Sequence, residues 1–144
     1  MNKGFVALAG AIALAASAFA APNTQTYRDS MGRNQGTAST DSSGKRTTYR
    51  DAQGRSQGYS DTTGNHTTYR DSTGRLEATS QTDSSGHTTF RDAQGRLLGT
   101  ATTDPSGRVT YRDSMGRLQG TATTDSSGRT TYRDGQGRLK GTKK

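Results

Sequence analysis

Short segments of the chain alternate apolar and polar residues with a period of two. In RVTYR, residues 108–112, Val109 and Tyr111 lie on one face and the polar residues on the other. In RLQGTATT, residues 117–124, a leucine, a glycine and an alanine at alternate positions share one face. This alternation, with many threonine and aromatic residues, is typical of half-buried β-strands. The chain therefore predicts short strands with an apolar face built from a tyrosine, a leucine and an alanine.

These segments are separated by one recurring motif, Asp-x-x-Gly. The aspartate side chain can accept a hydrogen bond from the backbone two residues later, and the glycine can take the positive φ that follows a type I turn in a bulged hairpin. Pro105 in DPSG fits this interpretation, because the second position of such a turn has the φ of proline. Each motif is therefore predicted to reverse the chain between two strands. The eleven motifs begin at Asp29, Asp41, Asp51, Asp61, Asp71, Asp83, Asp92, Asp104, Asp113, Asp125 and Asp134.

The turns belong to a longer repeat that opens with an aromatic-Arg-Asp triplet. Successive aromatic residues are separated by 22, 20, 21, 21 and 21 residues, and a period of about 20 to 50 residues is typical of repeat architectures. We therefore expect an all-β fold, an antiparallel meander of tandem β-hairpin repeats forming an open or curled single sheet. The alternative is a two-sheet β-solenoid. The six aromatic residues are Tyr27, Tyr49, Tyr69, Phe90, Tyr111 and Tyr132.

Apolar residues are too few for an ordinary hydrophobic core. Beyond residue 20, Leu, Ile, Val and Phe number only seven among 124 residues, a composition that by itself favours disorder. Repetition argues against disorder, because repeats bury thin apolar faces on their neighbours. We therefore expect the sheet to curl until its tyrosine and leucine face meets itself or a second copy of the chain.

The first twenty residues have the pattern of a secretory signal. A short basic start, residues 1–3, precedes the apolar run GFVALAGAIALAA, residues 4–16, and a small-x-small pattern precedes a cleavage site between Ala20 and Ala21. The run is shorter than the roughly 20 apolar residues of a spanning helix, which favours a signal over a membrane anchor. Without cysteine there is no acylation site of the lipoprotein kind. The short, alanine-rich leader predicts a bacterial protein exported to the periplasm or beyond.

Four segments follow from these patterns. They are a signal peptide, residues 1–20, an N-terminal linker, residues 21–26, a six-unit β-hairpin repeat domain, residues 27–141, and a basic C-terminal tail, residues 142–144. We expect both ends of the exported chain, from residue 23 to 26 and in the tail, to be loose. With no cysteine, the chain has no disulfide to hold the repeats.

The charge distribution gives the most specific hint about function. The chain has 20 basic and 12 acidic side chains, and all acidic ones except Glu77 are the turn aspartates. The arginines form two series, one after the aromatic residue and one after the turn glycine. Either each arginine pairs with a turn aspartate, with little gain for an exposed pair, or the rows bind a polyanion such as an acidic glycan, lipopolysaccharide or extracellular DNA. The candidate binding residues are Arg28, Arg50, Arg70, Arg91, Arg112 and Arg133 in the first series and Arg33, Arg55, Arg75, Arg96, Arg117 and Arg138 in the second.

No group of residues points to catalysis. His66 and His87 occupy similar positions before a Thr-Thr pair and lack the third donor that a metal site needs. Asp-Ser-Ser-Gly lacks the alternating oxygen donors of a calcium loop. We therefore expect no enzymatic activity, no cofactor and no bound metal.

Two segments resemble a known family. YRDSMGRL, residues 111–118, and FRDAQGRL, residues 90–97, resemble the YD repeats of bacterial RHS-type proteins, whose units read Tyr-Asp-x-x-Gly-Arg-Leu. The resemblance covers residues 27 to about 141 and departs from the family in the arginine between tyrosine and aspartate. The spaced glycines resemble MORN repeats less closely. The YD resemblance implies a secreted antiparallel sheet used as a shell, an adhesive surface or a carbohydrate contact, with no catalytic residues.

We therefore expect an exported, non-catalytic structural or binding module at the bacterial cell envelope, which contacts glycans or polyanions through its arginine rows and has no membrane span after signal removal. The alternative is a self-associating, curli-like fibre or matrix component, because stacked hairpins are the basis of cross-β order. Thr-x-Thr pairs such as Thr121 and Thr123 could also match ice, but other units break this array and threonine is a good strand former.

Overall fold

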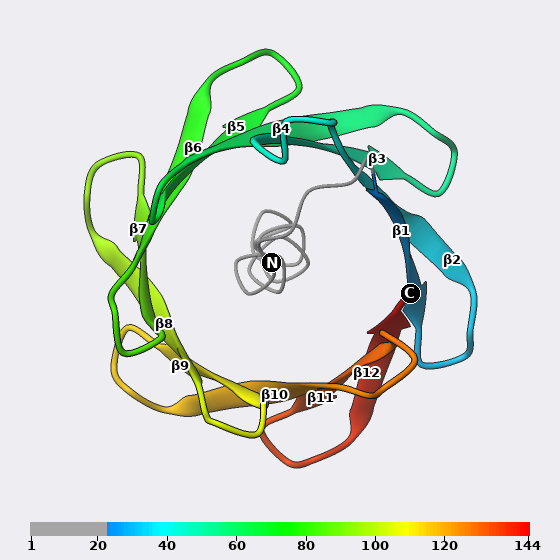
Figure 1. Cartoon of the computed structure of the whole chain (residues 1–144), viewed down its shortest axis with the longest axis vertical. Helices are drawn as coiled ribbons and strands as arrows, with labels where there is room; N and C mark the ends of the chain where they lie inside the picture. Colours follow the sequence, from blue (N-terminus) through cyan, green and yellow to red (C-terminus); the bar gives the residue numbers. More distant parts are fainter. Residues whose placement is uncertain (1–22) are drawn as a thin grey trace.

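The computed structural model describes residues 23–144, which form twelve strands joined by short turns, with no helix in this range (Figure 1). The strands are β1 (Asn23–Asp29), β2 (Asn34–Thr40), β3 (Arg46–Asp51), β4 (Ser56–Thr63), β5 (His66–Asp71), β6 (Leu76–Thr82), β7 (His87–Asp92), β8 (Leu97–Thr103), β9 (Val109–Asp113), β10 (Leu118–Thr124), β11 (Thr130–Asp134) and β12 (Leu139–Lys143). The expected signal peptide and its cleavage site at Ala20 and Ala21 lie outside the described residues.

The strands form one closed antiparallel barrel. Each strand pairs with its neighbours in the chain, and β1 pairs with β12, with Tyr27 opposite Lys143 and Arg28 opposite Thr142. The all-β meander of hairpin repeats is therefore confirmed. The open sheet is wrong, as is the two-sheet solenoid, because the curl continues until the first and last strands meet. Closure gives every strand two partners and removes the edges from which a cross-β fibre would grow.

The two ends of the described chain form the seam of the barrel instead of being loose. Residues 23–26, expected in a linker, belong to β1, and Thr142 and Lys143, expected in a tail, belong to β12. The prediction failed because it placed these residues outside the repeat domain, as a linker and a tail, whereas closure pairs each end with the other.

Ten of the eleven Asp-x-x-Gly motifs form the predicted turn. In these ten, the glycine N–H donates to the aspartate carbonyl oxygen at 2.9–3.2 Å, and the glycine has φ between 70° and 86°. Asp113 is typical, because its Oδ1 accepts from the backbone N–H of Met115 and from that of Arg117, each at 2.9 Å. Aspartate and glycine therefore reverse the chain as the sequence predicts.

The eleventh motif, which begins at Asp61, does not form this turn. Here β4 continues to Thr63, which pairs with His66, so that a two-residue loop of Gly64 and Asn65 closes the hairpin. Gly64 has φ 60°, which suits the first position of a type II′ turn. The inserted Asn65 changes the loop, and the Asp61 carboxylate pairs with a side chain on the neighbouring strand instead of capping a turn.

One face of the sheet forms the lining of the barrel, and aromatic rings alternate there with small residues. Phe90 is 1% exposed, and Ala101 and Ala122 are also buried. Tyr111 lies opposite Ala101 on one side and opposite Gly120 on the other. A Cβ at Gly120 would lie 2.2 Å from the Arg133 carbonyl oxygen, so glycine permits the close approach of β10 and β11.

The leucines that directly follow arginine-containing turns, such as Leu118, do not join this inner face, which corrects the predicted apolar face. Leu98, one residue further along its strand, does pack against inner residues, Tyr69 and Ala78. The register between β9 and β10 shifts between Leu118 and Gly120, so Leu118 lies opposite Arg112. The shift is a β-bulge, which turns the residues before it to the other face. Leu118 is consequently 43% exposed. The inner face consists of an aromatic residue, a glycine or alanine, and an alanine or serine in most units.

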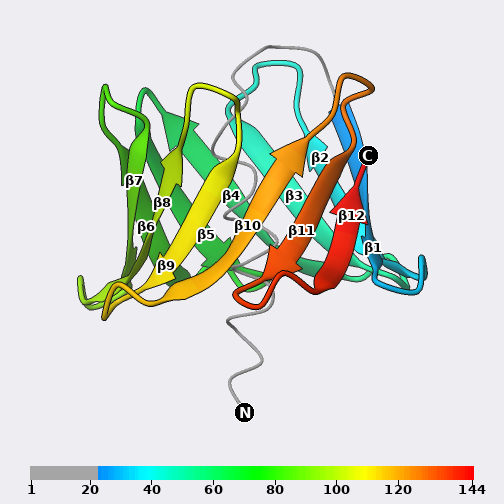
Figure 2. The same cartoon turned by 90° about the horizontal axis from the view of Figure 1, so that it is seen from below.

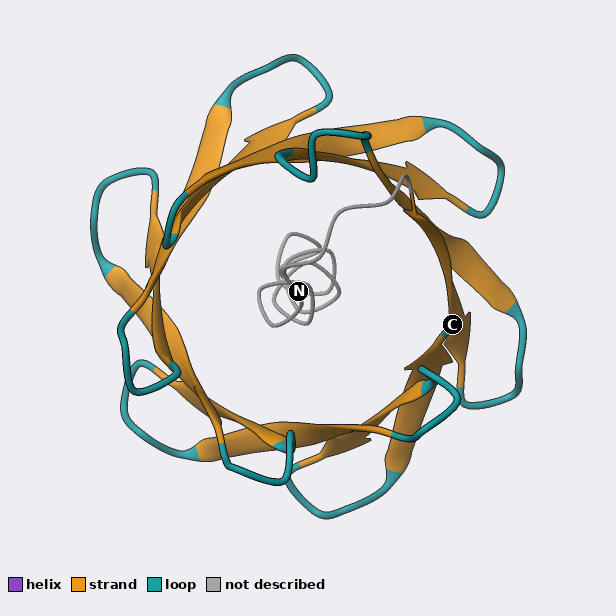
Figure 3. Ribbon diagram, in the orientation of Figure 1, coloured by secondary structure: helices purple, strands orange, loops and turns teal. Residues whose placement is uncertain are grey.

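The turns lie at two ends of the barrel, which we call the arginine rim and the serine rim. The arginine rim consists of the six turns β1–β2, β3–β4, β5–β6, β7–β8, β9–β10 and β11–β12, at the lower end of Figure 2. These six turns splay away from the barrel axis (Figure 3). The serine rim, at the opposite end, consists of the other five turns and the seam ends near Asn23 and Lys144.

Candidate functional site: the arginine rim and the lumen

The first arginine series binds the backbone of the turns that form the arginine rim. In each unit, Nη1 of the arginine after the aromatic residue donates to the carbonyl oxygen of the turn glycine at 2.9–3.0 Å. Arg112, for example, donates to Gly116. This contact fixes the guanidinium over the turn, four residues ahead in the chain. The six pairs are Arg28 with Gly32, Arg50 with Gly54, Arg70 with Gly74, Arg91 with Gly95, Arg112 with Gly116 and Arg133 with Gly137.

The second arginine series forms ion pairs with the aspartates of the same turns. The arginine Nε lies 2.6–2.7 Å from Oδ2 of the aspartate four residues earlier in five units. In the sixth, the Thr73 hydroxyl donates to Oδ1 of Asp71, and Arg75 forms no ion pair within the described residues. The five pairs are Arg33 with Asp29, Arg55 with Asp51, Arg96 with Asp92, Arg117 with Asp113 and Arg138 with Asp134.

The pairing hypothesis is therefore confirmed for five arginines of the second series and wrong for the first series. The first series satisfies glycine carbonyl oxygens, because the carboxylate of each turn already accepts from backbone N–H groups and, in five of the six units, from the second arginine. The paired arginine side chains remain 70–77% exposed, whereas their aspartates are only 13–18% exposed. The guanidinium groups of the rim thus face solvent even where they are paired.

The turn aspartates stay ionised over a wide pH range. For Asp113, partial burial acts to raise the pKa, but hydrogen bonds from the Arg117 side chain and backbone and from the Met115 backbone outweigh it, and the net pKa is lowered. The same balance lowers the pKa of Asp29, Asp51, Asp92 and Asp134. A carboxylate that accepts several hydrogen bonds in its charged form is stabilised in that form.

Charge is segregated between the two rims. The arginine rim has twelve arginines against six aspartates, a net formal charge of +6. At the serine rim the five remaining aspartates nearly balance the basic residues, which are Lys45, Arg46, Arg108, Arg129, Lys143 and Lys144. Arg46 is bound there, because it donates to both carboxylate oxygens of Asp61 and lies over the Tyr59 ring. One end of the barrel is therefore strongly basic.

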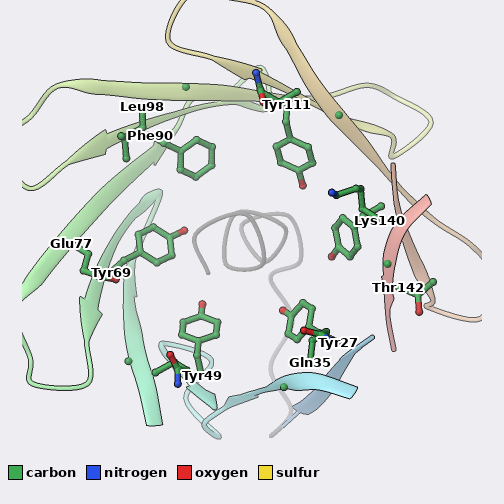
Figure 4. Close-up of a pocket in the computed structure, with 18 of the residues that line it drawn as sticks. Tyr27, Gln35, Tyr49, Tyr69, Glu77, Phe90, Leu98, Tyr111, Lys140 and Thr142 are labelled. Atoms are coloured by element: carbon green, nitrogen blue, oxygen red, sulfur yellow. The ribbon is translucent and has the colours of Figure 1, made fainter. Parts of the chain in front are cut away.

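The six aromatic residues of the repeats line the lumen of the barrel. Figure 4 shows Tyr27, Tyr49, Tyr69, Phe90 and Tyr111 directed toward the axis from strands all around it. They line a cavity of about 610 Å³ together with Tyr132 and with side chains near the arginine rim, such as Gln35, Glu77 and Lys140. The alternation along the strands predicts that the aromatic residues share one face, but it does not predict the lumen, because no local signal shows that the sheet closes.

The lumen presents hydroxyl groups as well as ring faces. The hydroxyl of Tyr49 lies 2.9 Å from Oγ of Ser60, and that of Tyr69 lies 3.3 Å from Oγ of Ser80. Three further tyrosine hydroxyls are buried and have no hydrogen-bond partner among the described residues: Tyr27, Tyr111 and Tyr132. Burial raises the pKa of each of these tyrosines, since the phenolate would lose hydration.

Neither histidine nor any metal cluster adds a second site in the described range. His66 and His87 lie at the serine rim, where Nδ1 of His87 is 3.1 Å from Oγ1 of Thr102. Residues 23–144 contain no group of three or more His, Cys, Asp or Glu side chains that could hold a metal. The same residues include no helix that could cross a membrane.

Comparisons with known proteins agree with the repeat pattern. The model of the RHS repeat family matches residues 70–109 and, in a second overlapping copy, residues 91–130. A search of curated proteins found no significant match. RHS repeats are typical of secreted or cell-surface bacterial proteins. The aromatic-Arg-Asp units of residues 70–130, with their Asp-x-x-Gly turns, are therefore RHS repeats, also known as YD repeats.

Proposed function

We propose that the protein is an exported, non-catalytic binding module of the bacterial cell envelope, which binds polyanions through the arginine rim. Suitable ligands are an acidic glycan, lipopolysaccharide or another polymer that carries phosphate or carboxylate groups. The observation that carries the proposal is the charge segregation, with twelve arginines and six aspartates at one end of the barrel. Guanidinium groups match phosphate and carboxylate oxygens with two parallel hydrogen bonds.

Contacts within the turns hold the arginine side chains in place and leave them accessible to such a ligand. The Arg112 contact with Gly116 uses one Nη1 donor, and the guanidinium has further N–H groups. The Arg117 side chain is 71% exposed although it pairs with Asp113. An exposed ion pair is weak, so a polyanion can compete for the guanidinium. Because both contacts lie within one turn, the guanidinium groups of the arginine rim keep their spacing in the absence of ligand.

Salt dependence tests the proposal. Binding of the barrel to heparin, a soluble polyanion, should weaken steeply as salt rises from about 50 to 200 mM, because bound counterions are released on association. Salt-insensitive binding, or no binding, would contradict the proposal.

A matched pair of double variants locates the contact. Arg117→Gln with Arg138→Gln removes two charges from the arginine rim, whereas Arg108→Gln with Arg129→Gln removes two from the serine rim of neighbouring strands. The first pair should reduce the salt slope by about one unit for each arginine that contacts an anionic group. The second pair, at the serine rim, should change the salt slope little. Equal loss in both would show that net charge, and not the arginine rim, governs binding.

A further inference from the structure

Exposed apolar side chains gather at the same end of the barrel as the arginines. Among the described residues, the exposed large hydrophobic side chains are Met31, Leu97, Met115, Leu118 and Leu139. Met31 and Met115 lie in the turns of the arginine rim and are 72% and 77% exposed. The three leucines are the first residues of β8, β10 and β12, directly after these turns. Four of the five turns of the serine rim have serine at the position of these methionines, as in Ser106 and Ser127, and the fifth is the Gly64-Asn65 loop.

The leucines lie beside arginines on the outer surface. Leu97 is opposite Arg91, Leu118 opposite Arg112 and Leu139 opposite Arg133. Each arginine thus lies next to an exposed leucine just behind a turn. On strands β7 to β12, apolar and cationic side chains therefore lie side by side near the arginine rim, whereas β2 and β4 begin with the polar Asn34 and Ser56.

We propose that the arginine rim docks the barrel end-on onto an anionic lipid surface. The inference deepens the proposed function and rests on it, because the same arginines supply the attraction. The arginines bind the phosphate groups of the lipids, and the methionines and leucines enter the boundary between headgroups and acyl chains. Basic residues near an anionic leaflet and a small apolar contact act together, since neither alone gives stable attachment.

The shape of the rim favours a surface over a soluble polymer. The six turns splay away from the axis at one end of the barrel (Figures 2 and 3), so their tips surround the axis and can meet a plane together. A soluble polyanion would make no use of Met31 and Met115, whose exposure to water is unfavourable. A lipid surface uses both the charge and the apolar groups.

The first experiment compares two binding partners for one pair of variants. The partners are vesicles of phosphatidylcholine with phosphatidylglycerol, and heparin. Met31→Gln with Met115→Gln is a conservative change, because Gln53, Gln94 and Gln136 occupy the same turn position in other units. We expect this variant to lose about tenfold in vesicle affinity, since two apolar contacts are removed, and to bind heparin as before. Vesicles of phosphatidylcholine alone should bind weakly.

The outcomes separate the inference from the proposed function. Unchanged vesicle affinity in the methionine variant, with heparin binding intact, overturns lipid docking and leaves the arginine rim as a polyanion site. If the double variant Arg117→Gln with Arg138→Gln keeps its affinity for both vesicles and heparin, both proposals are overturned.

The second experiment tests the orientation. The chain contains no tryptophan, so one introduced tryptophan reports its own surroundings. Emission of Met115→Trp should shift to shorter wavelength on anionic vesicles, whereas emission of Ser127→Trp, at a turn of the serine rim, should not. A shift at Ser127→Trp, or none at Met115→Trp, overturns the end-on orientation.

Discussion

Thr26 and Lys144 exchange both backbone hydrogen bonds, at N···O distances of 2.7 Å and 3.2 Å. This pair continues the ladder between β1 and β12, in which Arg28 lies opposite Thr142. The two ends of the described chain therefore complete the barrel. A sheet with a bare edge at each end would leave the aromatic face open to water, so closure and burial depend on the same few residues.

Proline at the seam should open the barrel. In an antiparallel ladder, residues two positions apart repeat the same hydrogen-bonding geometry, so Thr142 is expected to bond to Arg28 as Lys144 does to Thr26. Thr142→Pro removes that donor and should cost about 3 kcal/mol. Thermal unfolding followed by circular dichroism, with sedimentation velocity for shape, measures the loss.

Proline at a turn serves as the control for the seam. Ser126 occupies the position that Pro105 occupies in another turn of the serine rim, so Ser126→Pro should leave the melting temperature nearly unchanged or raise it. If both variants melt alike, the seam does not hold the barrel together.

The turn aspartates should matter more than an aspartate that pairs only with a side chain. Asp113 accepts two backbone N–H bonds and two side-chain bonds, from Arg117 and Gln119. Asp61 accepts only from Arg46 among the described residues. We therefore expect Asp113→Ala to lower the melting temperature by several degrees and Asp61→Ala to lower it less. The reverse order, by scanning calorimetry, would contradict the role of the turn aspartates.

The sequence predicts the parts of the fold that depend on local chemistry. Aspartate and glycine at fixed positions determine the turns, and the period of two determines the strands, so ten turns follow from the sequence. Leu118 was assigned to the wrong face, because a bulge beside a turn shifts the alternation by one residue. The sequence predicts a curled single sheet but not its closure into a barrel, since closure depends on the combined curvature of twelve strands, which no single unit determines.

The candidate site was predicted in the same uneven way. The arginines could be listed from the repeat, and five of the expected aspartate pairs exist. Their segregation to one rim follows from the hairpin topology, because every turn after an aromatic-Arg-Asp triplet lies at the same end. The tyrosines face one common lumen only because the sheet closes, so this arrangement could not be inferred from the sequence.

Replacing Lys143 should stabilise the barrel. Lys143 is 6% exposed and lies on the inner face, opposite Tyr27 and Thr130, at the position where other units have Ala101 or Ala122. Burial lowers its pKa, because the ammonium loses hydration. Lys143→Ala should therefore raise the melting temperature by about 4 °C, or about 1 kcal/mol in a domain of this size. Lys144→Ala, which removes an exposed charge next to it, should have little effect, and a similar gain there would assign the effect to net charge.

The tyrosines of the lumen should make the barrel sensitive to alkali. Burial raises the pKa of Tyr27, Tyr49, Tyr69, Tyr111 and Tyr132, so the folded state favours the neutral phenol. A group with a raised pKa in the folded state stabilises the fold fully below its unfolded pKa, about 10 for tyrosine. That contribution is lost as pH rises above this value toward the folded pKa. Tyrosinate absorbance should therefore appear together with the loss of the β-sheet circular dichroism signal.

Tyr59, which faces outward under Arg46, has to be replaced before tyrosinate absorbance can report on the lumen alone. In Tyr59→Phe every remaining tyrosine lies on the inner face, so its absorbance change reports only the lumen. We expect this variant to titrate in one cooperative step that coincides with unfolding. Reversible tyrosinate formation near pH 10, with the sheet signal intact, would show that water reaches the rings and that the aromatic lining is not the buried core of the barrel.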